Sequence, residues 1–297
     1  MKKAILIIFC LSTVLSFSEY PVRTKKIEAG SITPPDTSIL KNGTKILKNG
    51  TKILCIPFTP TSIDGCILWL DAGKGVTKDI NDYVSRWDDY SGKNYDAIQG
   101  TGAYQPKYIA NGVNEKPIIR FDGNNDFLNI SSFDLSYTKD LTLFVIWKTN
   151  SNTASQTLLS FPEYNTSVYF NIRLNPTAEK FYSQVYGNIG RNEIFSKTTA
   201  IPNTFEVRMY AVKNTALLAG DQVQYWINGS RDISCSCSPC VVNTNNWTND
   251  VLYIGQLPSY GIYLNGDIAE IIIYGNSLQD ENRIKVEKYL NKKYNLY

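Results

Sequence analysis

Three cysteines lie close together in the sequence, at Cys235, Cys237 and Cys240. Thiolates at this spacing could bind zinc if Cys66 or a carboxylate supplied the fourth ligand. In a protein outside the cytoplasm the same side chains would form disulfides, and we favour that interpretation. In one arrangement Cys55 forms a disulfide with Cys66, and a second disulfide forms within the triplet. In the other, Cys55 and Cys66 each form a disulfide with a cysteine of the triplet. The sequence leaves the two arrangements open.

Histidine is absent from the 297 residues, which excludes Ser-His-Asp triads and His-ligated zinc. Acid–base chemistry would need carboxylates, lysine, tyrosine or thiols. Asp267 and Glu270 are the acidic pair closest to a glycosidase arrangement, but their odd spacing predicts opposite faces of a strand. We therefore expect no enzyme activity, and keep a polysaccharide-active hydrolase or lyase as an alternative.

Several aspartates lie in loop-like contexts that could offer oxygen ligands to calcium. The candidates are Asp71, Asp122 and Asp126. The segment from Asp122 to Asp126 is also good turn chemistry without metal, because Asp, Gly and Asn all favour turns. The patterns require no cofactor, and calcium is the metal that they allow.

A glycan site usually presents an exposed aromatic ring beside amide or carboxylate groups. Trp87, Trp226, Trp247 and Tyr260 are candidates because they lie near turns or on polar-facing strand positions, and Asn246 supplies an amide next to Trp247. The alternative is that these rings belong to the core. The sequence thus predicts a glycan or a surface protein as the partner.

Residues 1–18 have the pattern of a signal peptide: Lys2 and Lys3, then an apolar stretch, then small residues near Ser18. Its removal leaves 28 basic and 27 acidic residues from the original 30 and 27, so we expect no nucleic-acid partner. It also removes Cys10, leaving an odd number of cysteines. We expect a protein that is secreted or held at an extracellular or virion surface, with no membrane span after cleavage.

Residues 19–62 form a Pro- and Thr-rich tether that contains a tandem repeat, residues 40–46 and 47–53, each reading Leu-Lys-Asn-Gly-Thr-Lys-Ile. Asn-Gly is a turn signal, so the repeat predicts short strand–turn units or no regular structure. A single domain is expected from residue 63 to residue 297.

Alternating apolar and polar residues predict strands over 168–175, 205–211 and 223–227. Residues 141–147 and 268–274 are almost uniformly apolar, which predicts strands buried on both faces. One C-terminal helix is expected, with a capping box from Ser277 to Asp280 and an apolar face of Val286, Tyr289, Leu290 and Tyr294. The fold class predicted is all-β: an antiparallel two-sheet β-sandwich, or jelly roll, with this helix packed on it.

An ordered series of segments supports that fold: 67–72, 86–97, 117–128, 141–147, 252–255, 266–274 and 288–294. In this order they resemble laminin-G-like, concanavalin A-like lectin–glucanase jelly-roll domains. The resemblance implies two curved sheets packed face to face, and the glucanases of this fold use a Glu-x-Asp-x-x-Glu motif that the sequence lacks. Because the fold serves many functions, the site must decide. We expect a secreted, non-catalytic domain that recognises a glycan or glycoprotein, with a self-assembling virion, sheath or surface-layer component as an alternative.

Overall fold

The computed structural model describes residues 44–46, 52–54, 57–161, 170–176, 180–187, 190–213, 223–232 and 249–297. The chain divides into two compact units, Met1–Ser62 and Ile63–Tyr297. In the first unit, β1 (Thr44–Ile46) and β2 (Lys52–Leu54) pair antiparallel, one from each copy of the repeat, and η1 spans Pro60–Ser62. The expected signal segment lies outside the described residues.

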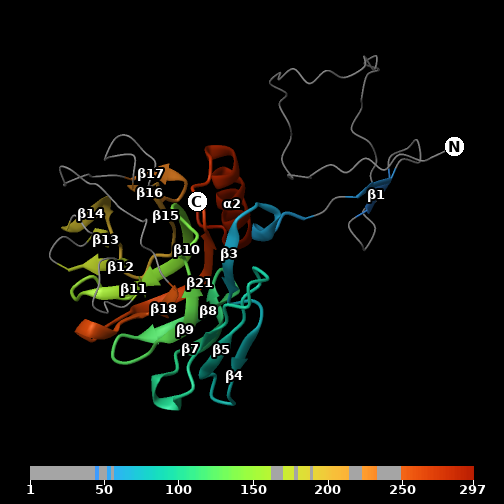
Figure 1. The fold of residues 1–297 in the computed structure, drawn as a ribbon. Coiled ribbons are helices and arrows are strands. Elements are labelled where there is room, and N and C mark those ends of the chain that lie inside the picture. The colour runs from blue at the N-terminus through green and yellow to red at the C-terminus, as the bar shows by residue number, and fades with distance from the viewer. Residues whose placement is uncertain are drawn as a thin grey trace. The chain divides into compact units, whose positions relative to one another are not determined.

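The second unit is a sandwich of two antiparallel sheets, which confirms the predicted fold class (Figure 1). The eight-stranded sheet contains β3 (Cys66–Asp71), β7 (Lys107–Val113), β8 (Lys116–Asp122), β10 (Leu141–Thr149), β15 (Glu206–Val212), β16 (Val223–Ile227), β17 (Ser230–Arg231) and β21 (Asn265–Tyr274). Its order is β17-β16-β15-β10-β21-β8-β7, with β3 also paired to β21.

The nine-stranded sheet runs in the order β14-β13-β12-β11-β18-β9-β6-β5-β4. Its strands are β4 (Val76–Lys78), β5 (Val84–Trp87), β6 (Ala97–Ile98), β9 (Leu128–Asp134), β11 (Gln156–Ser160), β12 (Phe170–Asn175), β13 (Lys180–Gly187), β14 (Gly190–Thr199) and β18 (Asn249–Ile254). A small hairpin of β19 (Gln256–Leu257) and β20 (Ile262–Tyr263) follows β18, and the short helices η2 (Gly102–Tyr104) and η3 (Pro258–Tyr260) lie in loops.

The centre of the eight-stranded sheet is buried on both faces, as predicted for residues 141–147 and 268–274. The strands β10 and β21 pair along their length, and every residue of these two segments is buried. Alternate residues such as Val145 and Ile271 join the core between the sheets. Their neighbours Phe144 and Ile272 lie on the outer face of the same sheet and are equally buried, because another element covers that face.

That covering element is α2 (Asp280–Tyr294), which packs against the eight-stranded sheet (Figure 1). Val286, Leu290 and Tyr294 are buried, which confirms the predicted apolar face. The predicted capping box is wrong: the N-cap residue is Gln279, and it makes no side-chain cap hydrogen bond. The acids of the first turn and the lysines of the last turn still suit the helix dipole. No helix in the described part of the chain is long and apolar enough to cross a bilayer.

A β-bulge in β21 changes which residues share a face. Ile146 pairs with Glu270 and the next residue, Trp147, pairs with Ile268, so Ala269 is an extra residue in β21. Ile268 and Ile271 therefore both face the core. Asp267 and Glu270 alternate with them and both lie on the outer face, so the prediction that they point to opposite faces is wrong.

Candidate binding face

The outer surface of the nine-stranded sheet carries a row of directly paired residues. Arg86 of β5 pairs with Ile98 of β6, and Ile98 pairs with Asn129 of β9. Asn129 in turn pairs with Tyr253 of β18. Each of the four has at least one sequence neighbour in the core between the sheets, such as Trp87 beside Arg86 and Leu128 beside Asn129. The four side chains therefore point to the outer face, because successive residues of a strand alternate.

Three aromatic rings lie side by side at one end of this row. The ring centroids of Tyr104 and Phe127 are 5.9 Å apart, and those of Phe127 and Tyr253 are 6.0 Å apart. Tyr104 is 42% exposed and Ile98 is 46% exposed. We call Ile98, Tyr104, Phe127, Asn129 and Tyr253 the aromatic face. It combines flat apolar rings with one amide, which is the chemistry of a stacking platform.

The backbone around Tyr104 and Phe127 is held by hydrogen bonds. The Phe127 N–H donates to the Tyr104 carbonyl (3.1 Å), and the buried Gln99 side chain donates to the Phe127 carbonyl (3.3 Å). The Gln105 side chain donates to the Gln99 carbonyl (2.8 Å). These bonds fix two of the three rings before any ligand arrives, which limits the conformational entropy that binding would cost.

Charges border the aromatic face. Arg86 donates to Asp88 (2.6 Å) and to Asp96 (2.7 Å), and its hydrogen bond to Asp88, with the charges of both acids, raises its pKa. At the other end, partial burial and the charge of Asp250 raise the pKa of Tyr253. The guanidinium is therefore already engaged, and the tyrosine has an acidic neighbour.

Two of the tryptophans predicted as platforms are buried. Trp87 is 0% exposed, because an extra residue, Ser85, in β5 turns both Val84 and Trp87 into the core. Trp226 is 7% exposed: it lies on the outer face of the other sheet, and the Arg283 guanidinium of α2 stacks 4.9 Å above its ring. Both predictions of an exposed ring are therefore wrong.

The remaining glycan candidates fall in different places. Tyr260 is 57% exposed in η3, between β19 and β20. Asn246 and Trp247 lie outside the described residues. The sequence did not point to Phe127, Tyr104 and Tyr253, because their contact depends on three separate segments meeting. The pairing of Asn129 with Tyr253, which brings β9 beside β18, has no local signature in the sequence.

The three calcium candidates are not brought together. Asp71 is buried and forms ion pairs with Lys293 (2.6 Å) and Lys74 (3.7 Å). Asp126 accepts a hydrogen bond from the Asp122 N–H (3.0 Å), and burial together with the Asp122 charge raises the pKa of Asp126 to about 6. Among the described residues, no group of three or more Cys, Asp or Glu side chains could hold a metal ion.

Cys66 is a buried free thiol in this structure. Burial, and then the charge of Asp89, raise its pKa to about 12, so little thiolate exists at neutral pH. The other disulfide candidates, Cys55, Cys235, Cys237 and Cys240, lie outside the described residues.

A second polar cluster lies under α2, around Glu270, which is 0% exposed. Glu270 pairs across the sheet with Asp71, and Lys293 reaches both carboxylates, at 2.7 and 2.6 Å. Glu270 also accepts hydrogen bonds from Trp69 Nε1 (2.7 Å), Tyr289 OH (2.9 Å) and Tyr294 OH (2.9 Å). Burial raises the pKa of Glu270, although Lys293 acts in the opposite direction. The cluster holds α2 on the sheet, and the buried carboxylates are closed to a substrate.

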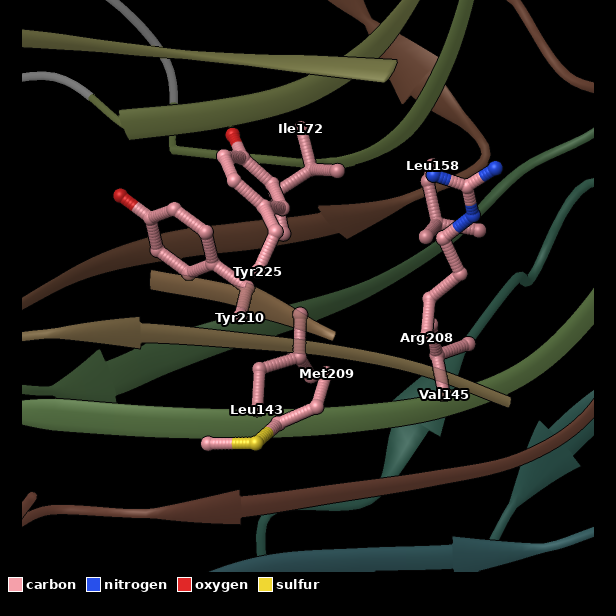
Figure 2. Close-up of a pocket in the computed structure, with 8 residues that line it drawn as sticks. All are labelled: Leu143, Val145, Leu158, Ile172, Arg208, Met209, Tyr210 and Tyr225. Carbon is pink, nitrogen blue, oxygen red and sulfur yellow. The ribbon is translucent and has the colours of Figure 1, made fainter. Parts of the chain in front are cut away.

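A third polar group lies between the sheets (Figure 2). Glu206 and Arg208 form a buried ion pair (2.5 Å), and the Tyr210 and Tyr225 rings pack 5.2 Å apart. The side chains of Arg208 and both tyrosines border a cavity of about 10 Å³, about the space of one water molecule. The alternation over 205–211 predicted this strand, but its charged side faces inward, opposite to the usual arrangement. The cavity is too small for a sugar.

Comparisons with known proteins show the fold alone. No protein-family model matches the chain, and no curated protein sequence matches it. Among solved structures, a Trypanosoma rangeli sialidase is similar with a TM-score of 0.55 and 12% identity, over 80% of this chain and 34% of the sialidase. The receptor-binding domain of botulinum neurotoxin D is similar with a TM-score of 0.52 and 12% identity, over 78% of this chain and 54% of that chain.

A further structure of the botulinum neurotoxin serotype D binding domain, in complex with N-acetylneuraminic acid, gives a TM-score of 0.51 and 13% identity, over 78% of this chain and 53% of that chain. The chain therefore spans about a third to a half of the length of these proteins. These proteins share a two-sheet β-sandwich architecture with this chain. The similarity to laminin-G-like and concanavalin A-like domains remains a resemblance in sequence, because no family model matches.

Proposed function

We propose that the sandwich is a non-catalytic recognition domain that binds a glycan, free or on a glycoprotein, through the aromatic face. The observation that carries this proposal is the contact of Tyr104, Phe127 and Tyr253 beside the Asn129 amide on an outer sheet surface. A sugar ring has apolar C–H faces and hydroxyl edges, so stacked aromatics and an amide suit both.

Location outside the cytoplasm fits this proposal but is an expectation from the sequence. The toxin domain in the comparison was solved with N-acetylneuraminic acid, and this chain matches 34% of the length of the sialidase. Those ligands belong to those proteins. They support a carbohydrate as the first class of ligand to test, and they leave the particular sugar open.

The test is a glycan array with the purified domain, with and without EDTA. We expect binding to at least one glycan class, and Tyr104→Ala and Tyr253→Ala to weaken it by about three- to tenfold each, since a stacked ring contributes roughly 0.5–1.5 kcal/mol. The EDTA arm reports on calcium, which the sequence allows as a ligand.

Two exposed tyrosines elsewhere supply matched controls. Tyr137→Ala removes a 61% exposed ring, and Tyr260→Ala removes the exposed ring that the sequence had predicted as a platform. Unchanged binding in both, with losses at Tyr104 and Tyr253, would support the aromatic face. Loss only in Tyr260→Ala would move the site to η3, and no binding on the whole array would contradict the proposal.

A further inference from the structure

We infer that the aromatic face selects uncharged oligosaccharides over acidic ones. This inference rests on the proposed function and adds the class of sugar. It comes from the charges that border the face. An acidic ligand such as a sialic or uronic acid needs a free cation, whereas the border offers a paired arginine and carboxylates.

The cation at the edge of the face is already neutralised. Arg86 donates through Nε to Asp88 and through Nη2 to Asp96, at 2.6 and 2.7 Å. Its side chain therefore faces two carboxylates, and a sugar carboxylate would have to displace one of them. A guanidinium holds a carboxylate best when both partners can form a two-bond fork, and here the donors of that fork are divided between two acids.

Another nearby cation is engaged differently. Lys107 begins β7, three residues after Tyr104, and its Nζ lies 4.9 Å from the centre of the Tyr83 ring. This ammonium group is therefore already engaged with the ring of Tyr83, which does not belong to the aromatic face.

The opposite edge is acidic. Asp250 lies three residues before Tyr253 in β18, and partial burial together with the Asp250 charge raises the pKa of the Tyr253 hydroxyl. The contacts described above place one guanidinium and three carboxylates at the border, those of Asp88, Asp96 and Asp250. The resulting negative field repels an anionic sugar over about 8 Å at physiological salt, and leaves a neutral sugar unaffected.

The rings and the amide have no requirement for charge. Tyr104, Phe127 and Tyr253 present apolar surface to the C–H face of a sugar, and the Asn129 amide can both donate to and accept from hydroxyls. A neutral oligosaccharide satisfies each group on the face, whereas an acidic one would place its carboxylate beside Asp250 or against the pair of acids that hold Arg86.

The experiment measures the wild-type domain against matched pairs of oligosaccharides that differ only in oxidation of a hydroxymethyl group to a carboxylate. We expect the neutral member to bind about fivefold more tightly at 0.15 M salt, and the difference to shrink at 0.5 M salt because salt screens the repulsion. A neutral preference that salt leaves unchanged would overturn the electrostatic basis, and tighter binding of the acidic member would overturn the inference while leaving the proposed function intact.

A variant pair sharpens the result. Asp96→Asn removes one carboxylate and releases part of Arg86, so the acidic member should gain about threefold in affinity while the neutral member stays unchanged. Glu281→Gln removes the same charge from the exposed surface of α2, where Glu281 pairs with Lys285, and should change neither. Equal gains in both variants would contradict a local effect. Absence of binding to either sugar class overturns the proposed function, and this inference with it.

Discussion

The two sheets of this sandwich have outer faces with opposite characters. On the eight-stranded sheet, α2 covers the outer face, and the side chains beneath it include Trp226, Asp71 and Glu270, all buried. On the nine-stranded sheet, the aromatic face keeps Ile98 and Tyr104 partly exposed. Both faces contain aromatic and charged residues, so composition alone does not decide which one binds. The covering helix makes one face a structural layer, and in the described part of the chain no α-helix covers the other.

The charges reinforce this difference. Under α2, Lys293 lies between Asp71 and Glu270, both almost inaccessible to water, so each ionic contact acts at low dielectric. Around the aromatic face, Arg86 pairs with Asp88 and Asp96 in contact with water, where ion pairs contribute little to stability. The first set of charges therefore stabilises the folded domain, and the second is the set on which the proposed ligand selectivity depends.

The largest effect is expected from Lys293→Met. This change leaves Glu270 and Asp71 buried and opposite each other without their shared cation, and removing one partner of a buried ionic group costs about 3–5 kcal/mol. Urea unfolding would measure the loss. Lys288→Met is the control, because Lys288 is exposed on the same helix. If the two variants were equally stable, α2 would not be held by this cluster, and the distinction between the faces would weaken.

A second prediction compares one aromatic residue from each face. Trp226→Ala should destabilise the domain by about 3 kcal/mol, because it opens a cavity beneath α2. Tyr104→Ala should change stability by less than about 1 kcal/mol, since an exposed side chain loses little burial. Thermal unfolding of both variants tests the contrast, and glycan binding should show the reverse order. Equal losses of stability would mean that the aromatic face is part of the folded core.

The sequence predicts the central layers of this fold well and the faces poorly. The strands over 141–147 and 268–274 and the helix face of Val286 and Leu290 follow from local patterns, and the structure confirms them. The errors at Trp87 and Glu270 have one cause. Each follows an extra residue in its strand, Ser85 or Ala269, and one extra residue reverses the alternation of all that follow.

Covering and pairing are also invisible to local patterns. Trp226 does lie on an outer strand position, but only the tertiary packing of α2 reveals that Arg283 covers it. Tyr253 lies more than a hundred residues after Tyr104 and Phe127 in the chain, and it meets them because β18 pairs with β9. The segments 117–128 and 252–255, which carry Phe127 and Tyr253, could be recognised in the sequence, but local patterns could not predict the long-range contact between these residues.

A third prediction concerns Cys66, which lies in β3 of the eight-stranded sheet. Because its thiol is free and buried, a maleimide should label it only after denaturation, and burial keeps its pKa at about 12. The other four cysteines of the processed chain would then be even in number and could all form disulfides. Mass spectrometry of peptides from non-reduced protein tests this. A disulfide at Cys66 would contradict it.

The smallest effect is expected at Asp126, which directly precedes Phe127 of the aromatic face. Its pKa is raised to about 6, so the folded protein favours the protonated form, and this contribution to stability is present below about pH 4 and is lost as the pH rises through 6. Asp126→Asn should therefore gain stability relative to wild type between pH 4 and 7, by about 1 kcal/mol after allowance for partial exposure. The chain has no histidine to obscure this titration.

Asp122, in the same loop, gives the opposite sign and serves as the control. Partial burial alone would raise its pKa, but hydrogen bonds from Asn124, Asn125 and Asp126 outweigh burial and lower it. Asp122→Asn should therefore lose stability relative to wild type as the pH rises through the ordinary carboxyl range. Thermal unfolding across pH 3–8 compares the two variants. If both variants lost stability relative to wild type as the pH rises, the hydrogen bond from the Asp122 N–H would favour the ionised carboxylate of Asp126. The charge of Asp126 would then not be unfavourable at this edge of the aromatic face.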